Sequence, residues 1–325
     1  MIETAGTLIG RSNVVTRSNY RPAPGLDLDA NPALLDRVRA NSVRALEGRE
    51  SFIHDAILLG RRVRLLSNSH HLADFWRDNF PTEAEWKSRT AEPVSPKPFL
   101  TVHAMIRVEA ESEAAYFSKA RREVYLFNSS YYGGLRACAM EAFGRLLEGL
   151  HVFHGAAVEV NGRVLAIVYP REVIHPTPTW GLMELPGARF LADGWLVAEP
   201  DGRIRAIEKS VYLRTCFLEN YPEYAPRILS AKFENIPPSD PAQTDPLARL
   251  VASKDSRAMV DAAALFGRSP FPASPPAAAA FQLSAGTGEP IRVAPVDPFP
   301  CPGYEVRVGS VAGHPREVAR LIART

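Results

Sequence analysis

Positive side chains stand in a short polar stretch, residues 169–178, that separates an apolar run from a predicted helix. Arg171 and His175 keep positive character in this stretch, and Thr177 followed by Pro178 is typical of a helix cap with proline at the first turn. A helix N-terminus beside a cation favours one carboxylate or one phosphate group. The alternative is a solvent-facing loop without a ligand, in which these charges have no common role.

The same region has the strand, loop and helix of a nucleotide-binding P-loop but lacks the residues that bind the phosphates. Residues 163–168 (RVLAIV) predict a buried strand, and residues 179–185 predict the start of a helix. A Walker A loop needs Gly-x-x-x-x-Gly-Lys-Ser/Thr, because glycine amides and the lysine surround the phosphates. The glycine, lysine and hydroxyl positions are occupied here by Tyr169, Ile174, His175 and Pro176. Three prolines remove amide donors and Glu172 adds negative charge, so we expect no binding of ATP·Mg²⁺.

Four segments around this loop carry a family resemblance. They are FHGAAVEVNGRVLAIV (153–168), the altered loop, GARFLADGWLV (187–197) and AIEKSVYLRT (206–215). Over roughly residues 125–235 the chain resembles the HPr kinase and PEP-carboxykinase-like P-loop kinases. The resemblance implies a P-loop kinase core in which a His-Gly opens a strand and a paired Asp-Asp supplies a catalytic base and a metal-side or phosphate-side carboxylate. The sequence keeps His154, Gly155 and Asp193, but Gly194 replaces the second Asp.

His154 and Asp193 are the predicted acid/base pair. Asp193 follows the apolar run ARFLA, at the carboxyl end of a predicted strand, where open α/β sheets place ligands. His154 is expected just before a strand, in the position that the resemblance gives to a functional histidine. The alternatives are a structural histidine and an aspartate that only forms a turn before Gly194. Loss of the second carboxylate weakens any Mg²⁺ site, and we predict no metal and no cofactor.

A second group of candidates lies in the segment EKSVYLR. Lys209, Ser210 and Arg214 are predicted to bind substrate, because the resemblance places this segment beside the acceptor site. Arg214 can hold an anionic group through two parallel hydrogen bonds. A structural ion pair of Arg214 with Glu208 or Glu219 is the alternative.

Other candidate residues have weaker patterns. Tyr132, in the loop before a predicted helix, is expected to line the pocket with aromatic surface. His70 and His71 are adjacent and point about 100° apart on a helix, so they do not form a metal pair. The three cysteines are widely spaced, which favours reduced thiols over a disulfide framework or a zinc site.

Composition limits the classes of partner. The 325 residues are 46% hydrophobic and can bury a sizeable core, and a net charge of +2 argues against nucleic acid as the main partner. We find no apolar run long enough to span a membrane and no secretory signal, and therefore expect a cytoplasmic protein. The 28 prolines against 5 methionines, with abundant alanine and arginine, indicate a bacterial genome of high GC content. The expected partner is a small-molecule substrate, with no membrane partner; assembly into a homo-oligomer is left open.

The periodicity of apolar residues predicts alternating strands and helices. In the first part, helices are expected at 31–46, 69–80 and 132–149, and strands at 57–66, 99–108 and 124–127. Further along, a hairpin is expected at 196–207, helices at 212–218, 225–229, 245–266 and 315–323, and strands at 291–293 and 304–308. Residues 269–280 (SPFPASPPAAAA) have the composition of a low-complexity linker or exposed loop.

These observations predict an α/β protein with an HPr-kinase/PEP-carboxykinase-like P-loop core, a smaller N-terminal α/β lobe and a C-terminal extension. The expected domains are residues 1–125, 126–268 and 269–325. The favoured function is an ATP-independent enzyme acting on a small anionic or polar metabolite, in a bacterial biosynthetic pathway, on a kinase fold that has lost ATP binding. The alternatives are a pseudokinase that binds a ligand or a partner, and a residual small-molecule or peptide kinase.

Overall fold

A computed structural model describes residues 7–9, 21–22, 28–168, 177–228, 231–236, 245–253, 256–267, 277–285, 292–295, 303–308 and 315–324. The chain divides into two compact units, residues 1–148 (unit 1) and residues 149–325 (unit 2). Strands and helices alternate in both units, so the predicted α/β class is confirmed. Among the described helices, none is at once long enough and apolar enough to cross a bilayer.

Unit 1 is built on a seven-stranded mixed sheet in the order β2-β1-β6-β7-β5-β4-β3. Its strands are β1 (Thr7–Ile9), β2 (Arg21–Pro22), β3 (Phe52–Leu58), β4 (Arg61–Ser67), β5 (Pro98–Met105), β6 (Ala114–Ser118) and β7 (Glu123–Phe127). The segment 57–66, expected as two short strands or one bent strand, belongs to the β3–β4 hairpin, whose turn residues Leu59 and Gly60 have positive φ. Strand β6 was not predicted: its residues, AAYFS, are buried throughout and lack the alternation that marks a half-exposed strand.

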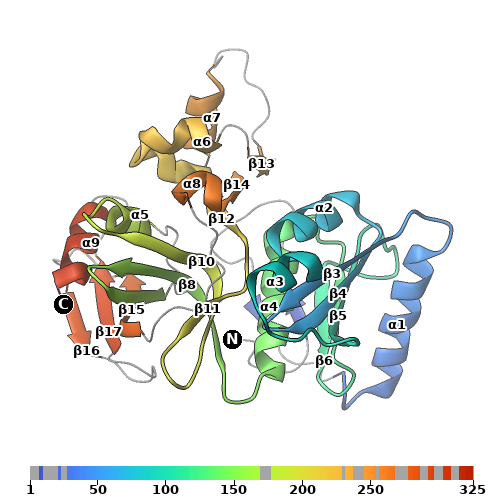
Figure 1. Ribbon diagram of the computed structural model, residues 1–325. Helices are drawn as coiled ribbons and strands as arrows, with labels where there is room; N and C mark the ends of the chain where they lie inside the picture. The colour runs from blue at the N-terminus through green and yellow to red at the C-terminus, as the bar shows by residue number, and fades with distance from the viewer. Residues whose placement is uncertain are drawn as a thin grey trace. The chain divides into compact units, whose positions relative to one another are not determined.

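The helices of unit 1 lie on both faces of this sheet. They are α1 (Pro32–Leu46), α2 (His70–Asn79), α3 (Glu83–Arg89) and α4 (Tyr132–Leu146). In Figure 1, α1 covers one face, where Leu34 and Val38 pack with Met105, and α2 and α4 cover the other. Asn31 and Ser69 cap α1 and α2, because the side chain of each accepts a hydrogen bond from the amide of the third helical residue. Helix α3, closed by a capping box, was missed.

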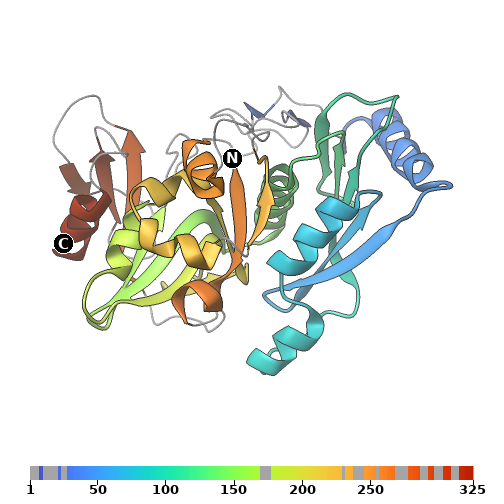
Figure 2. The same cartoon turned by 90° about the horizontal axis from the view of Figure 1, so that it is seen from above.

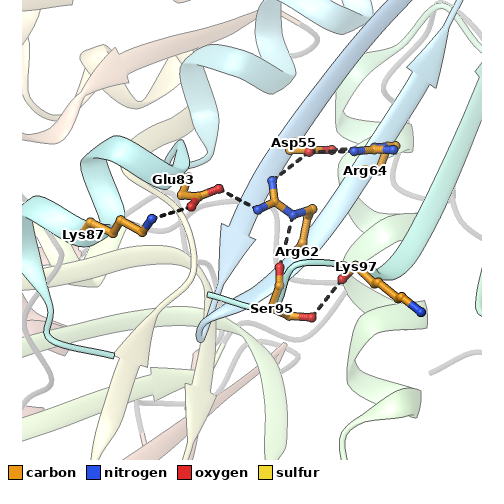
Figure 3. A network of polar contacts seen from close by, with 7 residues as sticks. All are labelled: Asp55, Arg62, Arg64, Glu83, Lys87, Ser95 and Lys97. Atoms are coloured by element: carbon orange, nitrogen blue, oxygen red, sulfur yellow. Dashed lines mark hydrogen bonds and ion pairs between the residues drawn. The ribbon is translucent and has the colours of Figure 1, made fainter. Parts of the chain in front are cut away.

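A charged network ties β3 and β4 to α3 and to the following loop (Figure 3). The guanidinium of Arg62 donates to Asp55 (2.8 Å), to Glu83 (2.6 Å) and to the carbonyl oxygen of Ser95 (3.2 Å). Arg64 donates to both oxygens of Asp55, at 2.8 and 2.9 Å. These hydrogen bonds hold the pKa of Asp55 below its ordinary value, against the effect of burial. The network therefore has a structural role within unit 1.

Unit 2 contains a second seven-stranded sheet, in the order β11-β10-β8-β9-β15-β17-β16. Its strands are β8 (His151–Val160), β9 (Arg163–Val168), β10 (Arg189–Ala198), β11 (Ile204–Ala206), β15 (Ala277–Ala285), β16 (Arg292–Pro295) and β17 (Gly303–Val308). The predicted hairpin at 196–207 is confirmed as β10–β11. The segment beyond residue 269, expected to be an extension, contributes three strands to this sheet. Its alanine run is not an exposed loop, because residues 277–280 begin β15 and pair in parallel with β9.

Helices α5 (Thr177–Met183) and α9 (Pro315–Arg324) lie side by side on one face of this sheet (Figure 1). Leu182 and Ile322 from these helices pack with Val158, Ile167 and Phe281 from the strands. The opposite face buries a second apolar layer that includes Ala157, Ala166, Leu196 and Ile204. Because both faces are covered, β9 shows a continuous apolar run, as predicted from its sequence.

A three-stranded sheet, β12-β14-β13, completes unit 2 and overturns two helix predictions. Its strands are β12 (Ser210–Arg214), β13 (Lys232–Glu234) and β14 (Arg257–Asp261); the short helices are α6 (Ala225–Ile228), α7 (Pro246–Ala252), α8 (Ala262–Phe266) and the 3₁₀ helices Thr215–Glu219 and Pro222–Tyr224. The segment expected as a helix at 212–218 forms β12 and a 3₁₀ turn, and the one at 245–266 is interrupted by β14. Cross-strand pairing outweighs local helix propensity at both places.

The helices around this sheet gather on its apolar side (Figures 1 and 2). Val211, Leu213 and Val260 face a buried aromatic cluster. The cluster contains Trp180, Phe190, Phe217, Tyr221, Tyr224 and Phe266. By the alternation of strands, the other side of the sheet carries the polar residues of β12, β13 and β14.

Candidate functional site

His154 lies inside a strand, not before one as predicted. Strand β8 begins at His151, so His154 is its fourth residue and is partly buried. Gly155 pairs with Val168, the last residue of β9. His154 therefore lies at the sheet edge where β9 ends and the chain leaves toward α5. This is the carboxyl edge of the parallel strands β9 and β15, where open α/β sheets place their ligands.

Asp193 occupies the middle of a ten-residue strand, whereas the sequence placed it at a strand end. The prediction failed because β10 continues past Gly194 by pairing with β8 as far as Ala198. Asp193 pairs with Ala156 and His154 pairs with Trp195, so the two candidates are diagonal neighbours on one face. Such diagonal positions are about 7–8 Å apart, a separation that one small substrate group spans. Asp193 is 8% exposed and is one of the few buried acidic residues of the described chain.

Two glycines that face each other fix the backbone of this site. Gly155 pairs with Gly194 across β8 and β10. A Cβ atom at Gly155 would lie 2.0 Å from the carbonyl oxygen of Ile167, so no side chain fits there. Gly194 has a φ of +121°, a conformation that residues with side chains rarely adopt. The backbone at Gly194 therefore gives a physical reason for glycine where the resemblance expects a second aspartate.

Trp195 and Glu208 belong to the same site, although the sequence interpretation gave neither a functional role. The indole of Trp195 lies 5.5 Å from the imidazole of His154, between ring centroids. Glu208 is 1% exposed, and its carboxylate accepts a hydrogen bond of 2.7 Å from the backbone amide of Trp195. Residues two positions apart share a face of a strand, so the sequence could have placed Trp195 beside Asp193. The role of Glu208 could not be predicted, because Glu208 contacts Trp195 only after the chain turns between β10 and β11.

Lys209, Ser210 and Arg214 follow Glu208 but do not converge on one point. Ser210 is buried at the start of β12, and Lys209 precedes it with a partly exposed side chain. Arg214 ends the strand, about 13 Å from Ser210 at the usual rise per residue. An ion pair of Arg214 with Glu208 or Glu219 was the alternative to its predicted substrate-binding role. Glu208 binds the amide of Trp195, and Glu219 is exposed in the following 3₁₀ helix.

The remaining candidates belong to unit 1 or lie outside the described residues. Tyr132 belongs to unit 1, where its fully buried ring packs 5.3 Å from that of Phe75 and forms part of the interior. Arg171 and His175 lie in residues 169–176, which are not among those described. The predicted anion site in that loop therefore stays a prediction.

The chemistry available at the edge of β8 and β10 is proton transfer beside a buried carboxylate. An imidazole titrates near neutral pH, and a nearby carboxylate orients it or stabilises its charged form. Within the described ranges, no group of three His, Cys, Asp or Glu side chains is arranged to hold a metal ion.

Two comparisons of the sequence with known proteins found no match. No family model matches the sequence. No curated protein matches it either. The functional argument therefore rests on the residues and on the geometry of unit 2.

Proposed function

We propose that the protein is an ATP-independent enzyme that acts on a small anionic or polar metabolite, on a core related to the HPr kinase and PEP-carboxykinase-like P-loop kinases. One observation carries this proposal: the pairing of β8 with β10 puts His154 and Asp193 on one face, at the edge where β9 ends. The order β9, loop, α5 is that of a P-loop unit, and the loop sequence lacks the residues that hold a triphosphate.

In this proposal His154 exchanges a proton with the substrate, and Asp193 favours the charged imidazole. Trp195 excludes water from one side of the imidazole, and Glu208 fixes the backbone of Trp195 through its amide. Glu208 is thus a positioning residue. Lys209 and Ser210 border the reacting group, and Arg214 holds a charge farther along the substrate, with Arg171 and His175 as additional cations.

A second candidate is a pseudokinase that binds a ligand without turnover. The observation that favours it is the burial of Asp193, which is 8% exposed and therefore offers little accessible surface to a substrate. A binding module needs the charge of this carboxylate but no exchange of protons with the ligand.

Turnover of a metabolite panel distinguishes the two candidates. The full-length protein is incubated with small carboxylates and phosphorylated metabolites, with and without ATP·Mg²⁺, and products are identified by mass spectrometry. We expect a product without nucleotide, and a loss of about 10²- to 10⁴-fold in rate for His154→Ala and for Asp193→Asn. The control is His151→Ala, an exposed histidine on the same strand.

Three outcomes would overturn the enzymatic proposal. The first is transfer of phosphate from ATP, and the second is full activity in both site variants. The third is ligand binding without any product, which would support the pseudokinase. Calorimetry with ATP·Mg²⁺ is a separate check, and micromolar affinity would contradict the loss of nucleotide binding. Thermal unfolding of each variant shows whether a lost activity reflects a lost fold.

A further inference from the structure

Two arginines of unit 1 lie over one phenylalanine ring, at the edge of the sheet where the parallel strands β4, β5 and β7 begin. The guanidinium carbon of Arg61, the first residue of β4, lies 4.5 Å from the ring centroid of Phe99 in β5. That of Arg122, the residue before β7, lies 5.0 Å from the same centroid. Strand β5 runs between β4 and β7, so the two arginines approach Phe99 from its two flanks.

The hydrogen-bonding capacity of these two guanidiniums is not used within the described part of the chain. There, contact with the Phe99 ring is the one interaction of each, and neither has a hydrogen bond or an ion pair. The neighbouring Arg121 differs, because it is paired with Glu123 at 3.2 Å. A guanidinium has five N–H donors, and contact with an aromatic ring leaves them available to acceptors. Arg61 and Arg122 are therefore held in place but unpaired.

Two lysines add positive charge to the same edge of the sheet. Lys97 lies two residues before Phe99, and in Figure 3 its side chain extends away from the network around Arg62. Lys119 begins the turn between β6 and β7, where its carbonyl oxygen accepts the amide of Arg122 at 3.3 Å. Both lysines are exposed, and neither has an ion pair with a described residue.

The carboxylates beside this edge already have partners in unit 1. Glu123 accepts the hydroxyl of Tyr125 at 2.6 Å and the guanidinium of Arg121 at 3.2 Å. Asp29 accepts the amide of Ala120 at 3.0 Å. These acids are therefore not available to pair with the arginines over Phe99 or with the two lysines.

Together these residues form an accessible surface, which we call the basic edge: Arg61, Lys97, Phe99, Lys119 and Arg122. The two lysines and Arg122 are exposed, while Arg61 and Phe99 are half-buried. The exposed carboxylates of Asp36 in α1 and of Glu148 after α4 belong to neighbouring helix ends and lower the local charge. The four cations outnumber these two acids, so the basic edge stays positive.

We propose that the basic edge binds an acidic segment of a protein partner, a stretch of chain that carries several Asp or Glu side chains. Arginine and aromatic residues are enriched where proteins contact each other, and guanidiniums match carboxylates through parallel hydrogen bonds. Contact with Phe99 restrains the arginines before the partner arrives, which lowers the entropy cost of binding. The cations come from separate turns of the sheet, so several carboxylates match them better than one small anion.

A nucleic acid fits these observations less well, because the chain has a net charge of only +2 and phosphate recognition needs a broad excess of cations. The inference concerns unit 1 alone and does not depend on the enzymatic function proposed for unit 2.

Fluorescence anisotropy of a labelled hexaglutamate peptide tests the surface in the full-length protein at low salt. We expect saturable binding that weakens as salt is added, because these charges are near the surface. Affinity should fall about 3-fold in Arg61→Gln and in Arg122→Gln, and about 10-fold in the double variant, as for the loss of exposed ion pairs. Labelled hexaglutamine has the same length without charge and should not bind.

Matched variants separate the basic edge from general effects of charge. Arg203→Gln removes one exposed cation from unit 2, where Arg203 is paired with Asp201 at 2.6 Å, and should keep the wild-type affinity. Phe99→Leu keeps all four cations but removes the ring that restrains two of them, and should weaken binding about 2- to 3-fold. Thermal unfolding of each variant shows that the fold is retained, and Arg122→Gln, at an exposed position, decides the question if Phe99→Leu does not fold.

Three results would overturn the inference. The first is hexaglutamate binding that does not saturate, and the second is equal affinity in the wild type and in the double variant Arg61→Gln/Arg122→Gln. The third is tighter binding of a labelled single-stranded hexathymidylate than of hexaglutamate, which would assign the surface to a nucleic acid instead of an acidic protein segment.

Discussion

Unit 1 and unit 2 each contain an arginine in a cross-strand pair, but its partner is an aspartate in unit 1 and a second arginine in unit 2. In the β3–β4 hairpin of unit 1, Arg64 pairs with Asp55, and the two side chains form a double hydrogen bond. In the three-stranded sheet of unit 2, Arg214 pairs with Arg257. Opposite charges in such positions contribute about 0.2–1 kcal/mol, while like charges directly opposed destabilise by a similar mechanism.

The two pairs differ in their expected effect on stability. In unit 1 the guanidinium of Arg62 donates through all three of its nitrogen atoms to groups of the same unit (Figure 3). Such a network stabilises unit 1. In unit 2 two like charges are directly opposed across β12 and β14. We therefore expect the loss of an arginine charge to cost more stability in the β3–β4 hairpin than in the three-stranded sheet.

The largest expected effect comes from backbone packing at the candidate site of unit 2, not from a charge. Gly155→Ala would put a Cβ atom 2.0 Å from the carbonyl oxygen of Ile167. We expect the unfolding free energy of unit 2 to fall by more than about 3 kcal/mol, since a backbone atom cannot move aside cheaply. Urea denaturation with unit-resolved hydrogen exchange measures it. The control Gly162→Ala has open space around it and should cost about 1 kcal/mol for its positive φ. Equal losses in the two variants would refute the steric explanation.

A second effect of similar size concerns pH and unit 1. Burial lowers the pKa of His103 from 6.5 to about 4, and its Nδ1 lies 3.0 Å from the hydroxyl of Ser42. Between these two pKa values the unfolded chain binds a proton that the folded unit does not. Stability is therefore complete above about pH 6.5 and falls as the pH drops toward 4, by as much as about 3 kcal/mol.

The variant His103→Gln should remove this dependence over the same window. Urea denaturation at pH 7 and pH 4.5, with hydrogen exchange of peptides from each unit, provides the measurement. The lowered pKa of Asp55 acts in a separate window, because its contribution is lost only as the pH falls below about 3.8. A wild-type unit 1 that is equally stable at pH 7 and 4.5 would contradict the neutral, buried state of His103.

A smaller effect is expected when the unit 1 network loses its central carboxylate. Asp55→Asn removes the negative charge that Arg62 and Arg64 share. We expect a loss of about 1–2 kcal/mol, reduced from the value of a buried pair because these side chains are partly exposed. Thermal unfolding in low and high salt measures it, and the loss should shrink as salt screens the charges. No loss at low salt would show that the network is dispensable.

The smallest effect compares the two arginine pairs directly. Arg64→Gln in unit 1 should lower the unfolding free energy by about 0.5–1 kcal/mol, because it breaks a bidentate ion pair. Arg214→Gln in unit 2 should lower it by less, because the substitution also relieves a like-charge pair. Urea denaturation of the two variants measures the difference. A larger loss for Arg214→Gln than for Arg64→Gln would contradict this comparison.

Elements with local signals could be predicted from the sequence alone. The helices expected at 31–46 and 69–80 are present as α1 and α2, and each has a side-chain cap that needs only an amide three residues away. The strand β9 and the β10–β11 hairpin were also predicted correctly, because strand burial and turn formation depend on neighbouring residues. His154 and Asp193 were identified as candidates before their common face was known.

Only the tertiary structure decided the pairings between distant segments. Helix propensity predicted 245–266 as one helix, but pairing with β12 makes Arg257–Asp261 a strand and brings Arg257 opposite Arg214. The alanine run at 277–280 looked like a linker, yet it forms β15 between β9 and β17, where small side chains fill both faces of a covered sheet. Glu208 reaches the amide of Trp195 only through the β10–β11 turn. Cross-strand hydrogen bonds and burial supply free energy that no local window of sequence contains.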